Sequence, residues 1–128
     1  MSRTASCACG RVSVRCQGEP LKVSLCHCRQ CQKRTGSAFG LAAFFPRDAV
    51  EATGPTRIYA RQSRSGQPVT FRFCAECGST VWWDAARLPD RIAVAVGAFA
   101  DPGFPPPTQA IFGERRHPWV TDPACFEE

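Results

Sequence analysis

The sequence predicts a mainly β protein, one domain over residues 1–128, whose strands are stapled together by cysteine knuckles. Apolar and polar residues alternate in several short stretches, which is the period of half-buried strands. The chain contains nine cysteines, and seven of them lie in close clusters that border such stretches. A length of 128 residues suits one compact domain that buries a core without several disulfides.

The strand pattern is clearest in residues 11–16, 21–26 and 69–74, where apolar and polar side chains alternate. Weaker strand candidates, each bounded by glycine, proline or charged residues, are 40–45, 56–60, 79–83, 91–96 and 109–113. Turn-forming residues separate these stretches at 18–20, 46–48, 61–68 and 101–107. A helical period is limited to about one turn at 31–35. We therefore expect short strands joined by turns.

The charge is unevenly distributed along the chain. Residues 1–73 carry 12 Lys and Arg against 3 Asp and Glu, whereas residues 74–128 carry 4 against 8. If seven cysteines bound two zinc ions as thiolates, the net charge would fall from +5 to about +2. A mildly basic protein suits a small carboxylate-bearing ligand at least as well as a phosphate backbone. Nucleic acid is therefore not the expected partner.

The sequence predicts a cytoplasmic protein with no membrane partner. Its longest apolar run is far shorter than the ~18 residues of a membrane helix, and MSRTASCACG contains no apolar signal region. Thiols stay reduced in the cytosol, so close cysteine pairs there indicate a metal site rather than a disulfide framework. The sequence does not determine the oligomeric state.

The seven clustered cysteines are Cys7 and Cys9 in CAC, Cys26, Cys28 and Cys31 in CHCRQC, and Cys74 and Cys77 in CAEC. Structural zinc takes four protein ligands, whereas catalytic zinc takes about three and keeps one position open. Seven donors divide most simply into one closed site and one open site, although spacing alone leaves open which clusters combine. One division joins CAC with CAEC, so that the bound metal would contribute strongly to folding.

Four other donors need separate consideration. His27 lies between two ligand cysteines, where neighbouring side chains point in opposite directions, which argues against ligation. Cys16 shares the alternating face of its strand with valines, which favours a buried apolar cysteine. Cys125 and His117 could each fold back to close the open site, although neither has a partner at knuckle spacing.

These clusters, with TGSAFG at 35–40 and FCAECGSTVWW at 73–83, resemble the glutathione-dependent formaldehyde-activating enzyme family, which also includes centromere protein V. The resemblance runs from SCACGRV through GEPLKVSLCHCRQC to IFGERRHPW, nearly the whole chain. It implies a β-tent fold of coiled antiparallel sheets. It also implies a structural zinc on Cys7, Cys9, Cys74 and Cys77, and a catalytic zinc on Cys26, Cys28 and Cys31.

The family reaction makes and breaks a carbon–sulfur bond: glutathione and formaldehyde give S-hydroxymethylglutathione. The resemblance therefore implies a zinc-dependent carbon–sulfur lyase with two zinc ions and glutathione as co-substrate. An open zinc suits such chemistry independently, because it can stabilise a thiolate and polarise a carbonyl oxygen. Arg29, Lys33 and Arg34 could hold the glutathione carboxylates, and Arg61 and Arg64 are further candidates.

The alternative function is a non-catalytic zinc module that binds a protein or nucleic acid. The basic first half of the chain and the resemblance to centromere protein V motivate this alternative. It predicts salt-sensitive binding to DNA or RNA. The aromatic residues Phe71, Phe73, Trp82 and Trp83 add little to it, because they follow strand periodicity and are more typical of a core.

Overall fold

The computed structural model describes residues 1–121 and contains two β-sheets. The larger has the strand order β10-β3-β4-β9-β8-β7-β6. Its strands are β10 (Gln109–Ile111), β3 (Lys22–Cys26), β4 (Gly40–Pro46), β9 (Arg91–Ala95), β8 (Thr80–Ala85), β7 (Pro68–Cys74) and β6 (Thr56–Gln62). The smaller sheet has the order β1-β2-β5, formed by β1 (Ser2–Ser6), β2 (Ser13–Gln17) and β5 (Val50–Thr53). The predicted mainly β class is confirmed.

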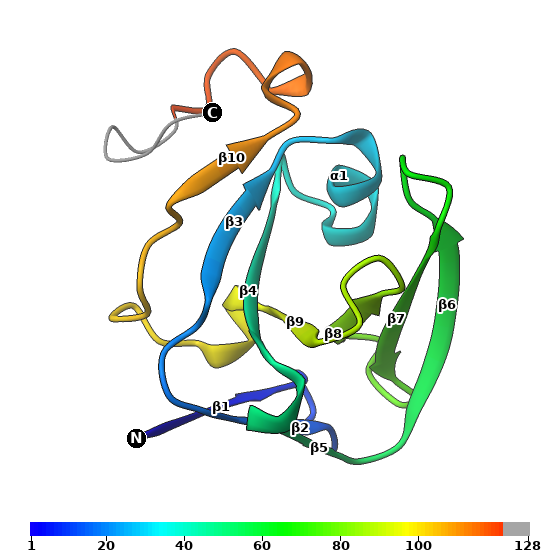
Figure 1. The fold of residues 1–128 in the computed structure, drawn as a ribbon, viewed down its shortest axis with the longest axis vertical. Helices are drawn as coiled ribbons and strands as arrows, with labels where there is room; N and C mark the ends of the chain where they lie inside the picture. Colours follow the sequence, from blue (N-terminus) through cyan, green and yellow to red (C-terminus); the bar gives the residue numbers. More distant parts are fainter. Residues whose placement is uncertain (122–128) are drawn as a thin grey trace.

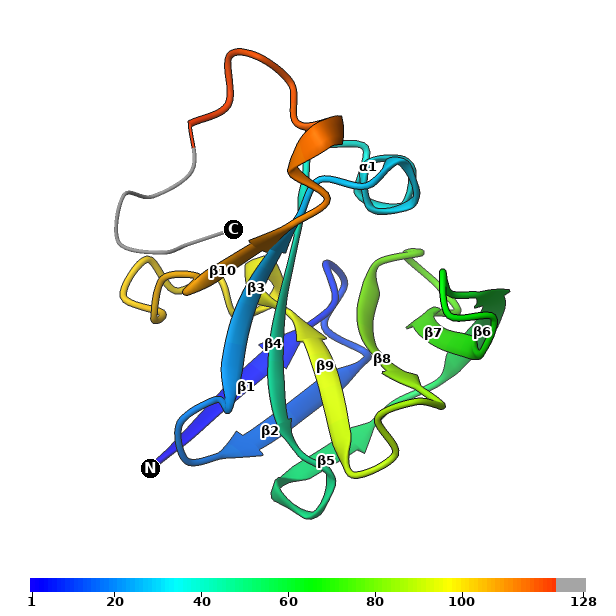
Figure 2. The same ribbon diagram turned by 45° about the horizontal axis from the view of Figure 1, so that its top comes forward.

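The larger sheet is strongly curved. Figures 1 and 2 show β6 and β7 standing across the molecule from β3 and β10, with α1 (Arg29–Thr35) near the top of both views. Short 3-10 helices occupy Arg47–Ala49, Val96–Phe99 and Gly113–Arg115. All strand pairs are antiparallel except β10 with β3, which is parallel, so the larger sheet is mixed rather than wholly antiparallel.

Every predicted strand is present, with small shifts at the ends. The strand expected at 11–16 begins only at Ser13, because the residues before it form a tight knuckle. In this knuckle the Cys7 N–H donates to the Val12 carbonyl, and the Gly10 N–H donates to the Cys7 carbonyl. The strands β1 and β5 were not predicted, because their residues are mostly exposed and show little apolar alternation.

The helix α1 is longer than the single turn expected at 31–35. It begins at Arg29 because the Cys28 sulfur accepts a hydrogen bond from the Cys31 N–H (3.4 Å), which satisfies a free donor of the first turn. It ends at Gly36, which takes the left-handed conformation (φ 67°) that glycine tolerates best. The cysteine knuckle and this helix are therefore one continuous local structure.

The core lies on both faces of the larger sheet. Ile92 and Val94 of β9 belong to the main cluster, which also contains Val14 and the fully buried Cys16 of the smaller sheet. The alternate residue Ala93 joins Phe71 and Trp83 in a second cluster on the opposite face. Burial raises the pKa of the Cys16 thiol to about 11, so this cysteine is an unreactive core residue, as the sequence indicated.

No helix among residues 1–121 is long and apolar enough to cross a membrane. Cys125, one of the candidate ligands, lies outside the described residues.

A charged bridge joins the neighbouring strands β7 and β8 to the 3-10 helix Arg47–Ala49. Asp84 accepts hydrogen bonds from Arg72 (2.8 Å) and Arg47 (2.9 Å), and its side chain is 22% exposed. Burial raises the pKa of the Asp84 carboxyl, but the two guanidinium groups outweigh burial and hold the pKa below its usual value.

We expect Asp84→Asn to lower the free energy of unfolding at pH 7 by about 1–2 kcal/mol, because two guanidinium groups lose their anionic partner. A carboxylate with a depressed folded pKa stabilises fully above its unfolded pKa of about 3.9 and loses this contribution as pH falls. Urea unfolding at pH 7 and near pH 3, where pH approaches the lowered folded pKa, measures both effects, with exposed Asp48→Asn as control. A constant difference between wild type and Asp84→Asn at both pH values would contradict this account.

Candidate metal centres and the adjoining cavity

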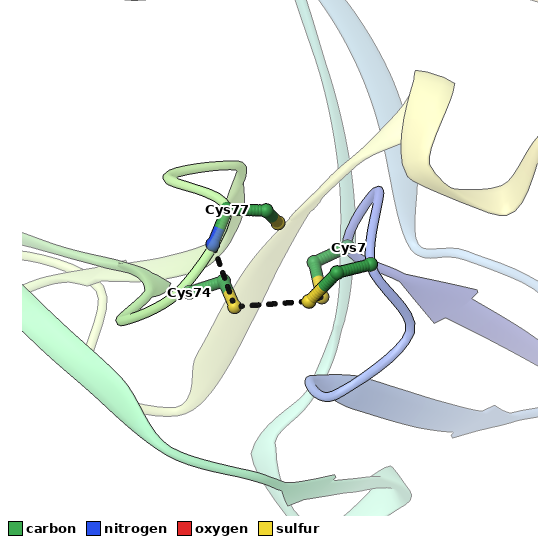
Figure 3. Close-up of side chains that lie close together, drawn as sticks. Cys7, Cys74 and Cys77 are labelled. Carbon is green, nitrogen blue, oxygen red and sulfur yellow. Dashed lines mark hydrogen bonds between the residues drawn. The ribbon is translucent and has the colours of Figure 1, made fainter.

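Four cysteines from the two sheets meet at one point. Figure 3 shows Cys7, from the knuckle after β1, facing Cys74 and Cys77 from the end of β7 and the turn that follows. The four sulfur atoms, including that of Cys9, lie within 4.8 Å of one another. The Cys7–Cys9 and Cys9–Cys74 sulfur distances are both 3.6 Å. Tetrahedral zinc with Zn–S bonds of 2.3 Å requires sulfur separations of ~3.8 Å, so this donor set fits zinc.

Backbone amides point at the sulfurs of this cluster. The Val12 N–H donates to the Cys7 sulfur at 3.2 Å, and the N–H groups of Glu76 and Cys77 donate to the Cys74 sulfur at 3.4 Å. Such donors stabilise a thiolate more than a thiol, and they hold each sulfur in a fixed direction. The two knuckles are therefore shaped for anionic sulfur ligands.

Ser79 links the two knuckles of the four-cysteine cluster. Its hydroxyl oxygen accepts a hydrogen bond from the Ala8 N–H (3.1 Å) and lies 3.3 Å from the Cys77 sulfur. Hydrogen bonds from the Ser79 side chain and backbone lower the pKa of Cys77 to about 5. The turn itself depends on Gly78, whose φ of 80° favours glycine.

The second cluster contains Cys26 from the end of β3, Cys28 from the start of α1, and Cys31 from within α1. Their sulfurs lie within 4.8 Å of one another, and each residue is half-buried. Among residues 1–121, no fourth Cys, His, Asp or Glu ligand belongs to this group. Hydrogen bonding from the Cys26 thiol lowers the pKa of Cys31 to about 6, while the same contact raises the pKa of Cys26. The group is an open set of three sulfur donors.

Neither histidine joins the three-cysteine group. His27 is fully buried and packs edge-on against Phe39, with ring centroids 6.3 Å apart. The Nε2 atom of His117 lies 2.8 Å from the Gln32 side-chain oxygen, and its ring packs against Trp119. These positions agree with the argument against His27 as a ligand and give His117 a role in holding the segment after β10 against α1.

A cavity of about 790 Å³ opens beside the three-cysteine group, on the face of the larger sheet that carries Phe71 and Trp83. Its walls come from α1, from the hairpin between β6 and β7, from the β8–β9 connection and from the segment after β10. Among residues 1–121 its lining is strongly cationic, because seven arginines line it against one carboxylate, that of Glu114. The arginines are Arg29, Arg34, Arg61, Arg64, Arg87, Arg91 and Arg115.

The cationic residues that the sequence indicated as ligand contacts line two different cavities in the structure. Arg29, Arg34, Arg61 and Arg64 line the main cavity, whereas Lys33 lines a smaller neighbouring hollow of about 310 Å³. Arg87, Arg91 and Arg115 were not predicted from the sequence. They reach the cavity from the β8–β9 connection, the start of β9 and the 3-10 helix Gly113–Arg115. For Arg29, Lys33 and Arg34 the signal was a position close to the cysteine cluster in sequence, and this signal does not identify cavity walls built from later segments.

Comparisons with known proteins are consistent with this geometry. A family model described as glutathione-dependent formaldehyde-activating enzyme matches residues 2–115. No curated protein matches the chain. Among solved structures, the crystal structure of a Rhodobacter sphaeroides protein, a structural genomics target, is similar with a TM-score of 0.60 and 21% sequence identity. The match covers 83% of this chain and 92% of that one, and it indicates a shared fold.

Proposed function

This chain belongs to the glutathione-dependent formaldehyde-activating enzyme family, and on that premise we propose that it is a zinc-dependent carbon–sulfur lyase. Its substrate would be the adduct of glutathione, or of another thiol, with a small aldehyde such as formaldehyde. The observation that carries the proposal is the open set of three cysteine sulfurs at the wall of a cationic cavity. A ligand with carboxylates and a thiol suits both features.

We assign two zinc ions to the two donor groups. The structural ion would be held by Cys7, Cys9, Cys74 and Cys77, and the catalytic ion by Cys26, Cys28 and Cys31. When bound at the open group, zinc supplies thiolate stabilisation and polarisation of an oxygen atom. The absence of a fourth donor from that group within residues 1–121 leaves room for a substrate atom.

The residues of the chain would bind and orient the adduct. Phe71 and Trp83 line the cavity and would limit the access of water to the reacting sulfur and carbon. The arginines of the cavity supply donors for the glutathione carboxylates. In the synthetic direction the thiol sulfur bonds to the carbonyl carbon, and the thiol proton ends on the carbonyl oxygen. The lyase direction reverses both changes, so no oxidant or reductant is needed.

Exchange spectroscopy with carbon-13 formaldehyde and glutathione tests the proposal directly. The zinc-loaded protein should accelerate interconversion of free formaldehyde and S-hydroxymethylglutathione by at least about tenfold over the uncatalysed exchange. Chelator-treated protein that is still folded serves as the control. Exchange at the uncatalysed rate for formaldehyde and for other small aldehydes would contradict a lyase function.

Gly40 gives a separate prediction about the open site. It pairs with Cys26 in the register of β3 and β4, and a Cβ atom placed there would lie 2.9 Å from Arg34 Nη2 and 3.2 Å from Cys31 Cβ. We expect Gly40→Ala to displace these neighbours and weaken the second zinc by about tenfold, a typical effect of disturbing residues behind metal ligands. Chelator titration measures the affinity of each zinc.

The matched control is Gly97→Ala, since a Cβ atom at Gly97 would meet no atom within 4 Å. It should leave both zinc affinities unchanged. If Gly40→Ala also left the second zinc at wild-type affinity, the close packing of Gly40 against Cys31 would have no role in metal binding.

The non-catalytic binding module remains the alternative. An absence of salt-sensitive DNA or RNA binding in a filter assay would count against its nucleic-acid form. A cytoplasmic location and a single domain over residues 1–128 also remain predictions.

A further inference from the structure

Arg34 is held in the cavity by aromatic rings. Its guanidinium carbon lies 4.4 Å from the Trp83 ring centroid and 5.5 Å from that of Phe71. Its Nε atom is buried and has no hydrogen-bond partner within the described part of the chain. The Nη2 atom and the Cys31 sulfur both lie within 3.6 Å of the point where a Gly40 Cβ would stand. Arg34 is thus the cavity arginine fixed beside the three sulfurs.

Two further arginines are fixed in the same way, on the hairpin between β6 and β7. Arg61 lies 5.3 Å from the Phe71 ring centroid, and Arg64 lies 4.9 Å from the Phe112 ring centroid. None of Arg34, Arg61 and Arg64 takes part in the ion pairs formed among residues 1–121. Aromatic packing orients these guanidinium groups. Arg34 also hydrogen-bonds to Cys31 and Arg61 donates to the Gln62 carbonyl (3.4 Å), but a guanidinium carries five N–H donors, so others can serve a ligand.

The cationic excess is larger than glutathione alone requires. Glutathione brings two carboxylates and one ammonium group, a net charge of about −1 near neutral pH. The cavity offers seven arginines, of which Arg91 pairs with Asp90 (3.5 Å), and within the described part of the chain its one lining carboxylate is Glu114. A ligand with a further negative charge would complement this field better. Because Arg34 lies beside the sulfurs, that charge would belong near the sulfur–carbon bond.

Resting on the proposed lyase function, we infer that the adduct handled here derives from an aldehyde with a carboxylate next to its carbonyl group, and that Arg34 determines this specificity by binding the carboxylate. Glyoxylate is the smallest such aldehyde. The thiol sulfur bonds to the aldehyde carbon, the thiol proton ends on the carbonyl oxygen, and the carboxylate is unchanged. Formaldehyde carries no group that Arg34 could bind in this way.

Calorimetric titration with two stable analogues tests the inference without relying on turnover. S-carboxymethylglutathione carries the extra carboxylate on the carbon attached to sulfur, and S-methylglutathione lacks it. Zinc-loaded wild type should bind the carboxymethyl compound at least about tenfold more tightly, as expected for a charge-assisted guanidinium contact. Arg34→Gln should abolish this preference, and Arg34→Lys should retain part of it because the charge remains.

Arg64→Gln is the matched control, because Arg64 also lines the cavity but is packed on Phe112 in the hairpin. It should weaken both analogues similarly and keep the preference. Equal affinity of wild type for both analogues would overturn the inference while leaving the lyase proposal intact. A preference that survives Arg34→Gln in folded, zinc-loaded protein would overturn the role of Arg34. Failure to bind glutathione and both analogues would instead contradict the proposed function itself.

Discussion

Cys77→Ser should unfold the chain or lower its melting temperature by more than about 10 °C. Cys77 belongs to the four-sulfur group that joins the turn after β7 to the knuckle between β1 and β2. Structural zinc sites contribute about 10–16 kcal/mol to folding, and the loss of one thiolate ligand removes much of this. Two members of the group, Cys7 and Cys74, are buried in the main core, so opened knuckles would expose core residues.

Circular dichroism melting and zinc content measure this prediction together. Ala75→Ser is the matched control, because it introduces the same hydroxyl group at an exposed position two residues away in the same turn. It should melt within about 2 °C of wild type, as most surface substitutions do. A Cys77→Ser protein with wild-type melting temperature would show that this group does not hold the sheets together.

Cys28→Ser should have the opposite effect: the fold is kept, one zinc is lost, and adduct exchange falls at least about 100-fold. Cys28 caps α1, and its sulfur accepts the Cys31 N–H. Serine is among the best residues at this position, so its hydroxyl oxygen can replace the sulfur as acceptor. Serine is nevertheless a poor zinc ligand compared with a thiolate, so the open group would lose its metal and the chemistry that depends on it.

The control for Cys28→Ser is Cys16→Ala, which removes a thiol that belongs to neither donor group. This variant should keep both zinc ions and full exchange activity, with a modest loss of stability from the small core cavity. Equal losses of melting temperature in Cys28→Ser and Cys77→Ser would refute the division into a catalytic and a structural site.

Strands in which buried apolar residues alternate with exposed polar ones could be predicted from the sequence. The strands β1 and β5, which bury very few residues, could not. Residues 69–74 alternate because one face of β7 packs in the core, and this pattern is readable without the structure. In β1 only Ala5 is buried, and Val50 is the one partly buried residue of β5. Neither strand therefore shows the alternation of apolar and polar residues that would predict it from sequence. These strands form because the backbone of β2 pairs with β1 along one edge and with β5 along the other.

The candidate site likewise combines features that follow from neighbouring residues in the sequence with features that depend on the packing of distant segments. Cysteines spaced as knuckles indicate a donor group by themselves, but the meeting of residues 7 and 74 depends on the packing of two sheets. The cavity is less predictable, because its walls join α1 to segments more than 25 positions later in the chain. Lys33 lies next to Arg34 in sequence, yet adjacent helix positions point in different directions, so only Arg34 lines the main cavity.

Native mass spectrometry of the purified protein, with and without glutathione, tests the central claim most directly. The account predicts two zinc ions per chain and one bound glutathione, with the glutathione and one zinc ion absent from Cys28→Ser. Two zinc ions in a protein that ignores glutathione would contradict it, because the three-cysteine group would then be closed by another ligand or serve another purpose.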